Sequence, residues 1–179
     1  KGDVHFLMER GQKDGFAVYG VPEVQLDGAP VSSTRIREAV GGGRFDEAGR
    51  LLGRVYTVLG TVMKGRRLGR SIGFPTANVE TGDGLVPPIG VYAVRALTGD
   101  GEWRNGVANL GRRPTVEPGD SPVRLEVHLL DFDGDLYDQT MEVAFVDKIR
   151  EERRFDGLDE LKQQIAKDAD AARRMLLGA

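Results

Sequence analysis

Five strand-length runs follow one another after Val55, and this succession most restricts what the chain can fold into. Each run is bounded by turn residues: Tyr56 to Met63, Ile89 to Leu97, Trp103 to Leu110, Val123 to Leu130 and Thr140 to Val146. Such spacing is typical of a small antiparallel barrel or sandwich. Apolar residues then recur every three or four positions from Leu158 to Leu176, after Asp156 as the expected N-cap. We expect this terminal helix to cover the barrel. We also expect Trp103 and Tyr92 to pack against the barrel.

The first fifty residues have a different pattern. Two short strand-like runs, Phe16 to Tyr19 and Pro22 to Leu26, are separated by turn signals. A helix is expected from the serines at 32–33 to the glycines at 41–43, and a second from Phe45 to Leu52, closed by Gly53. This order is typical of the last part of an α/β domain whose front is missing. We therefore predict two domains, 1–53 and 54–179.

Composition excludes several functional classes. The 179 residues carry a formal net charge of −3 and 7% aromatic residues, which argues against a nucleic-acid partner. The absence of cysteine excludes disulfides, thiolate catalysis and a zinc-thiolate site. No apolar run reaches the roughly 18 residues of a membrane span, and residues 1–20 lack a signal-peptide pattern. We expect a soluble, cytoplasmic protein without a membrane partner.

A basic, glycine-rich stretch from Met63 to Glu80 is the first candidate site. Lysine and arginine at 64, 66, 67 and 70 alternate with glycines at 65, 69 and 73. Glycines allow the backbone to approach a ligand, and successive N–H groups can bind an anion. Thr76 and Asn78 follow, two uncharged oxygen donors of the kind that Mg²⁺ accepts beside phosphates. The spacing fits neither Walker A nor the dinucleotide fingerprint, so a solvated loop remains the alternative.

The second candidate is the alternating strand from Val123 to Leu129. Its odd positions are apolar, whereas Arg124, Glu126 and His128 share the opposite face. Glu126 could act as a general base on a rigid strand, with His128 as a neighbour or a hydrogen-bonded structural residue. The alternative is a half-exposed strand with solvated charges. The acidic run at 131–135 does not match the EF-hand spacing, and we interpret it as a hairpin turn.

The order of these signals resembles a known family. GxVxxGRxLGRxxGFPTANV is followed by PPxGVYAV, NGVANLGRRPT, LEVHLLDFDGDLY and KIREERRF. Over about residues 54–177 the chain resembles the riboflavin kinase module, the C-terminal half of bacterial bifunctional riboflavin kinase/FMN adenylyltransferase (FAD synthetase). Residues 1–52, including VSSTRIR, resemble the last part of the adenylyltransferase domain.

The resemblance implies a mainly β fold, a six-stranded Greek-key barrel with a C-terminal helix, and ATP-dependent phosphorylation of riboflavin to FMN with release of ADP. It implies Mg²⁺ ligands at Thr76 and Asn78, a catalytic base at Glu126, and flavin contacts at Arg150, Glu151 and Phe155. The implied ATP-binding set is Gly65, Arg66, Gly69, Arg70, Gly73, Pro75, Thr76, Asn78 and Asn109, where the loop from Gly65 to Gly73 forms a flap over the phosphates.

The N-terminal segment carries a further implied site. In the family, a serine-, threonine- and arginine-rich segment contacts nucleotide phosphates at a helix N-terminus. The matching residues here are Ser32, Ser33, Thr34, Arg35 and Arg37. The HxGH-type motif that completes adenylyl transfer would lie upstream, so this chain by itself is not expected to make FAD.

Two departures from the family pattern, Asp138 and Ile149, affect only the placing of the flavin pocket. The alternative function is a non-catalytic flavin-binding barrel, which would not need Thr76, Asn78 and Glu126 together. We expect small molecules as the partners, and a monomer or weak self-association.

Overall fold

The computed structural model describes residues 4–65, 69, 72–112 and 123–177. The chain divides into two compact units, Lys1–Ser32 and Ser33–Ala179. None of the helices in these described ranges is long and apolar enough to span a lipid bilayer.

The first unit contains one helix and one short hairpin. Helix α1 (Val4–Asp14) was not predicted, and the expected strand at Phe16 to Tyr19 is absent from this described segment. A strand needs a hydrogen-bonding partner, and this run has none beside it. The second run contributes only β1 (Gln25–Leu26), which pairs with β2 (Ala29–Pro30) around the positive-φ residues Asp27 and Gly28.

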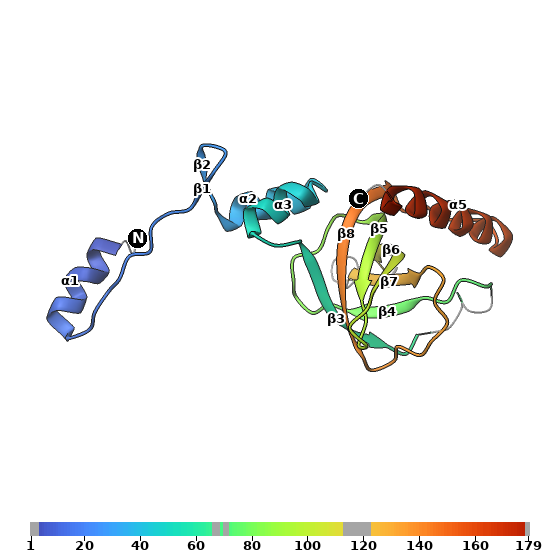
Figure 1. The fold of residues 1–179 in the computed structure, drawn as a ribbon, viewed down its shortest axis with the longest axis horizontal. Helices are drawn as coiled ribbons and strands as arrows, with labels where there is room; N and C mark the ends of the chain where they lie inside the picture. The colour runs from blue at the N-terminus through green and yellow to red at the C-terminus, as the bar shows by residue number, and fades with distance from the viewer. Residues whose placement is uncertain (1–3, 66–68, 70–71, 113–122, 178–179) are drawn as a thin grey trace. The chain divides into compact units, whose positions relative to one another are not determined.

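The second unit is built on a closed antiparallel barrel (Figure 1). Its strands are β3 (Thr57–Met63), β4 (Ala77–Glu80), β5 (Gly90–Leu97), β6 (Trp103–Arg112), β7 (Val123–Leu129) and β8 (Thr140–Arg150). They are arranged in the order β3-β4-β7-β6-β5-β8. Strands β5, β6 and β7 are consecutive neighbours and β8 returns beside β5, which is a Greek key. The predicted Greek-key barrel is confirmed.

Five of the six strands agree with the runs seen in the sequence, and β4 is additional. The hairpin interpretation of residues 131–135 is wrong, because the strands that this loop joins, β7 and β8, are not neighbours in the barrel. The loop instead crosses between distant strands, and Asp131 within it has a positive φ of 56°.

Two helices precede the barrel; they pack on each other, and the second packs onto the barrel. Helices α2 (Ser33–Gly41) and α3 (Phe45–Leu52) agree with the predicted pair, and Gly53 ends α3 in the left-handed conformation. Phe45 of α3 lies against the rings of Tyr56, Tyr92 and Phe145, with centroids 5.7–6.1 Å apart. The compact unit begins at Ser33, and the domain boundary after Gly53 stays a prediction. Assignment of residues 1–53 to an adenylyltransferase domain remains a prediction.

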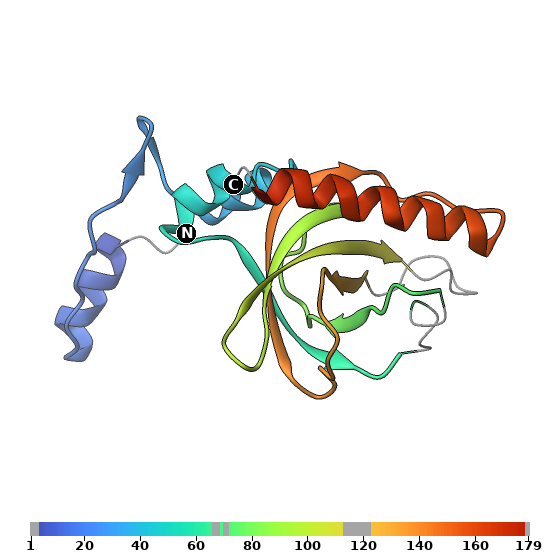
Figure 2. The same cartoon turned by 45° about the vertical axis from the view of Figure 1, so that its right-hand side comes forward.

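Helix α5 (Leu158–Leu177) lies across the barrel, as predicted (Figure 2). Its buried side packs Ala169, Ala172 and Leu176 against the barrel residues Val91, Ala93 and Val107. The helix begins two residues after the expected N-cap Asp156. Tyr92 is fully buried, but Trp103 leaves half of its surface exposed, so the expectation that it packs against the barrel is wrong for much of the ring.

Candidate active site

Three polar side chains form a row across three neighbouring strands. The register pairs Asn78 of β4 with Glu126 of β7, and Glu126 with Asn109 of β6. Directly paired residues point to the same face of a sheet. All three side chains are half-buried and line one cavity of about 370 Å³. The central carboxylate is thus flanked by two amides.

A tight turn brings Thr76 to the same cavity. Thr76 precedes Asn78 by two residues and so shares its face. The carbonyl of Gly69 accepts hydrogen bonds from the amides of Ile72 (3.3 Å) and Phe74 (2.8 Å), which closes the turn before it. A Cβ at Gly69 would collide with the carbonyl of Phe74, so the close approach requires glycine.

His128 supports this turn. Its Nδ1 donates a hydrogen bond to the carbonyl of Pro75 (2.8 Å), because a carbonyl can only accept. The edge of the Phe74 ring packs against the imidazole, with centroids 5.4 Å apart and the planes at 77°. His128 therefore holds the residue beside Thr76 and is a hydrogen-bonded structural histidine, as one of the two sequence-based interpretations predicted.

The carboxylate of Glu126 forms an ion pair with Arg124. Arg124 Nη1 lies 3.6 Å from Glu126 Oε1, and the two side chains are 40% and 35% exposed. This distance is too long for a hydrogen bond, and solvent screens a pair so exposed. The ion pair therefore leaves the oxygens of Glu126 free to accept further hydrogen bonds from the cavity.

The opposite wall of the cavity comes from the end of β8 and from α5. Arg150 donates through Nε (3.0 Å) and Nη2 (2.7 Å) to the carboxylate of Asp168 on α5. Phe155 lies beneath two guanidinium groups, 5.7 Å from Arg150 and 4.9 Å from Arg153. Leu161 and Ile165 of α5 also line this wall, which gives the cavity a broad apolar and aromatic side.

A second cavity of about 430 Å³ adjoins the turn that carries Thr76. Thr76 lines both cavities, and Pro75 and Lys64 line the second one. The far wall comes from the loop between β7 and β8, including Phe132 and Tyr137. The two cavities therefore share Thr76 as a lining residue.

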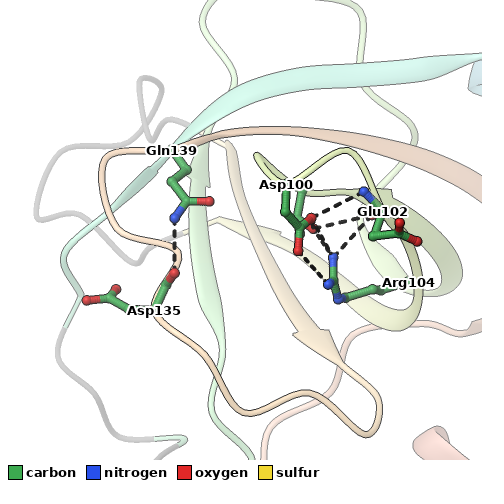
Figure 3. A network of polar contacts seen from close by, with 6 residues as sticks. Asp100, Glu102, Arg104, Asp135 and Gln139 are labelled. Carbon is green, nitrogen blue, oxygen red and sulfur yellow. Dashed lines mark hydrogen bonds and ion pairs between the residues drawn. The ribbon is translucent and has the colours of Figure 1, made fainter.

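The loop of the second cavity contacts Arg104 of β6 through Phe132. Arg104 lies over the Phe132 ring, 4.8 Å from its centroid. Its Nη2 is also 2.6 Å from Oδ2 of Asp100, in the turn between β5 and β6 (Figure 3). The hydrogen bonds from Arg104 are the main reason why the pKa of Asp100 lies well below its usual value. Within the loop, Gln139 Nε2 donates to the carbonyl of Asp135 (3.1 Å).

The first cavity brings together most of the predicted site residues: Gly69, Thr76, Asn78, Asn109, Glu126, Arg150 and Phe155. Pro75 lines the second cavity. Gly65 and Gly73 line neither, although a Cβ at Gly65 would collide with the side chain of Asn78. Glu151 also lines neither and pairs with Lys148 Nζ (2.6 Å). Arg66 and Arg70 fall outside the described residues.

The implied phosphate site of the N-terminal segment lies apart from both cavities. Ser33, Thr34, Arg35 and Arg37 occupy the beginning of α2, where Arg37 Nη1 reaches Ser33 Oγ at 3.4 Å. Ser32 is the last residue of the other compact unit. None of these residues lines either cavity.

Sequence reasoning missed Asp168 and Gln164. Asp168 is only 2% exposed and follows Leu161 and Ile165 on the same face of α5. Asp168 follows the apolar residue Leu161 by seven positions and Ile165 by three, so it interrupts the apolar stripe of the helix. That interruption was the signal that could have identified it.

A model of the Flavokinase family, described as riboflavin kinase, matches residues 52–176. The chain belongs to the riboflavin kinase family. The resemblance found in the sequence is confirmed, and every side chain that lines the two cavities falls inside the matched segment.

Relatives of this riboflavin kinase family member have matching names. The chain is 49% identical over 174 residues to the bifunctional riboflavin kinase/FMN adenylyltransferase of Pseudomonas fluorescens, covering 97% of this chain and 55% of the relative. It is 43% identical to the protein of that name from Escherichia coli (strain K12), with the same coverage. The chain thus spans about half the length of the curated relatives it matches.

A solved structure is also similar to this chain. The crystal structure titled macrolide-efflux protein, from Streptococcus pneumoniae, superposes with a TM-score of 0.76 at 34% identity, over 97% of this chain and 55% of that one.

Proposed function

We propose that the chain is the riboflavin kinase part of a bifunctional enzyme. It transfers the γ-phosphoryl group of ATP to the ribityl 5′-hydroxyl of riboflavin, giving FMN and ADP. The observation that carries this proposal is the position of Thr76, which lines two cavities, one of which is also lined by Glu126. Two substrates can then meet at one side chain.

Each cavity suits one substrate. Riboflavin occupies the cavity with Phe155, Leu161 and Ile165, because its planar isoalloxazine ring favours apolar and aromatic contacts. ATP occupies the cavity lined by Lys64 and Phe132, where an ammonium group and an aromatic ring match phosphate and base. The γ-phosphoryl group and the ribityl hydroxyl then approach each other beside Thr76.

Glu126 is the general base. Phosphoryl transfer needs the attacking and leaving oxygens nearly in line, and an acceptor for the hydroxyl proton. Glu126 stands in the middle of the polar row, on a barrel strand paired on both sides, so its carboxylate is held rigidly. In this position it takes the proton of the ribityl 5′-hydroxyl as the new P–O bond forms and the γ-phosphoryl leaves ADP.

The residues present fit a magnesium ion. Thr76 and Asn78 place a hydroxyl and an amide oxygen on one face beside the cavity. Hard cations accept such oxygens and take the rest of their coordination from phosphates and water. No cluster of three or more His, Cys, Asp or Glu that could hold a metal occurs in the described parts of the chain. When bound, Mg²⁺ would supply neutralisation of phosphate charge.

The basic flap and the flavin contacts complete the proposal. From the family resemblance, the stretch from Gly65 to Gly73, whose Arg66 and Arg70 lie outside the described residues, would cover the ATP phosphates. Arg150 and Phe155 line the first cavity and would contact the flavin, whereas Glu151 lines neither cavity and stays a predicted contact. FMN adenylyltransferase activity belongs to a longer protein of the kind named among the relatives, to which Ser32–Arg37 would contribute a phosphate site. We place the enzyme in the cytoplasm, as a monomer or weak self-associate without nucleic-acid or membrane partners.

One assay tests the function. The purified chain is incubated with riboflavin, ATP and Mg²⁺, and flavins and nucleotides are separated by chromatography. Equal amounts of FMN and ADP are expected, and chelation of the metal should stop their formation. Riboflavin binding without any FMN would instead identify a non-catalytic flavin-binding barrel.

A further inference from the structure

Helix α5 contributes Asp168 to the wall of the first cavity and carries Gln164 in contact with it, and no role yet explains either polar side chain. Asp168 is 2% exposed, although a buried carboxylate is costly unless it is paired. It accepts hydrogen bonds from Arg150 Nε and Nη2 and from Gln164 Nε2, the last at 2.7 Å. The burial and pairing fix the plane of the Arg150 guanidinium.

Gln164 connects this pair to a second arginine. Its Nε2 donates to Asp168, and its Oε1 accepts a hydrogen bond from Arg153 Nη2 at 2.8 Å. Since one end of the amide must donate and the other must accept, both contacts set its orientation. Gln164 lies one helical turn before Asp168, which lines the cavity.

Both arginines meet at one ring. The guanidinium of Arg150 lies 5.7 Å, and that of Arg153 4.9 Å, from the centroid of Phe155. Phe155 precedes α5 and is half-buried. The position of this ring therefore depends on two cations whose own positions are set by Gln164 and Asp168.

We propose that Gln164 and Asp168 are positioning residues that set the affinity for riboflavin by holding Arg150, Arg153 and Phe155 as one rigid wall. This inference rests on the proposed function, which assigns riboflavin to this cavity. A wall held before the substrate arrives avoids the entropy cost of ordering long side chains on binding. ATP lies in the other cavity, so its binding should not depend on this wall.

Gln164→Leu tests the proposal, with Gln163→Leu, an exposed neighbour on the same helix, as the matched control. The dissociation constant of riboflavin is measured by flavin fluorescence, together with kcat and the KM values for both substrates. Gln164→Leu should weaken riboflavin binding about tenfold, the effect of losing a hydrogen bond to a charged group. The KM for ATP should not change, and Gln163→Leu should match the parent.

A double-mutant cycle shows whether the effect passes through the ring. In a Phe155→Leu background, Gln164→Leu should add little further loss of riboflavin affinity. Independent, multiplying effects would overturn the positioning role. So would equal increases in the KM for riboflavin and ATP, or a lowered melting temperature with unchanged riboflavin affinity.

Asp168→Asn gives a second variant, which keeps the shape of the side chain and removes its charge. The same selective loss of riboflavin affinity is expected. If the parent chain binds riboflavin without making FMN, only the proposed function is overturned. The riboflavin affinities of the variants and the parent still decide the role of the wall. A parent that makes FMN, with Gln164→Leu indistinguishable from it, overturns the positioning role alone.

Discussion

Asn78 and Glu126 lie directly opposite each other on the neighbouring strands β4 and β7. One is the proposed metal ligand and the other the proposed base. Because both strands belong to a closed barrel, the spacing between the two side chains is set by backbone hydrogen bonds and not by a mobile loop. The proposed chemistry therefore depends on a fixed pair.

Glu126→Gln should fold normally and lose most turnover. The amide keeps the size of the carboxylate but cannot take a proton from the ribityl hydroxyl, so kcat should fall about 10²–10⁴-fold. FMN formation at saturating substrates measures this. Glu80→Gln, at the exposed end of β4, is the control. Near-parental turnover of Glu126→Gln would remove Glu126 from the mechanism.

Asn78→Ala should raise the Mg²⁺ concentration needed for half-maximal activity. The substitution removes one of two proposed oxygen ligands without adding charge or bulk. A Mg²⁺ titration of the initial rate measures the shift, and Asn105→Ala, an exposed asparagine on β6, should titrate like the parent. Superimposable curves for Asn78→Ala and the parent would show that the metal is held elsewhere.

Gly65→Ala should reduce activity without a comparable loss of stability. A Cβ there would collide with the side chain of Asn78, which must move from its place beside Glu126. A displacement near 1 Å in an active site can cost about 10²-fold in rate. Gly84→Ala, where a Cβ would make only an ordinary van der Waals contact with the carbonyl of Thr81, is the control in assays of kcat and of thermal unfolding. An active Gly65→Ala enzyme would mean that Asn78 can shift freely.

Phe45→Ala should destabilise the barrel even though it lies before the matched family segment. Its 5% exposed ring packs on Tyr56, Tyr92 and Phe145, and truncating a buried phenylalanine costs about 3–5 kcal/mol of unfolding free energy. Urea denaturation measures the change. Phe16→Ala, at a half-exposed position of the first unit, should change the stability of the barrel little. Similar stability for both variants would support the predicted domain boundary after Gly53.

Alkaline conditions should unfold the barrel through its buried tyrosines. Burial is the main cause that raises the pKa of Tyr56 well above its usual value of 10.0 and that of Tyr92 to about 12. Between pH 10 and 12 the unfolded chain loses protons that the folded chain keeps, so the free energy of unfolding falls as pH rises.

Tyr56→Phe tests whether the free energy of unfolding falls with rising pH because of the buried tyrosines. The variant loses the hydrogen bond from the Tyr56 hydroxyl to the carbonyl of Leu85 (2.6 Å), so it should be less stable near neutral pH by about 0.5–1.5 kcal/mol. Its unfolding free energy should nevertheless fall less steeply above pH 10. Parallel slopes for the variant and the parent would assign the alkaline unfolding to other groups.

The sequence predicted the elements with strong periodicity and missed those that depend on pairing. Five barrel strands and helices α2, α3 and α5 follow from hydrophobic patterns. Strand β4 has four residues after a glycine- and proline-rich turn, too few for a period to show. The pairing of Asn78 with Glu126 is a register between segments nearly fifty residues apart, which no local pattern contains.

One further miss has a specific physical cause. The amphipathic rule assigns charged residues to the solvent face, so Asp168 went unnoticed although Arg150 offsets its burial. The packing of Phe45 on aromatic residues of the barrel was not predicted either, because it joins distant segments of the chain.

The seam between β3 and β8 has a consequence for synthesis of the chain. Thr57 Oγ1 donates to Glu142 Oε1 at 2.7 Å across 85 positions of sequence, joining the first and last strands. As the chain leaves the ribosome, β3 must keep one edge unpaired until β8 emerges, and such edges are prone to aggregation. Because α5 follows β8 in the sequence, the wall that Leu161, Ile165 and Asp168 give to the first cavity can form only after β8 has emerged.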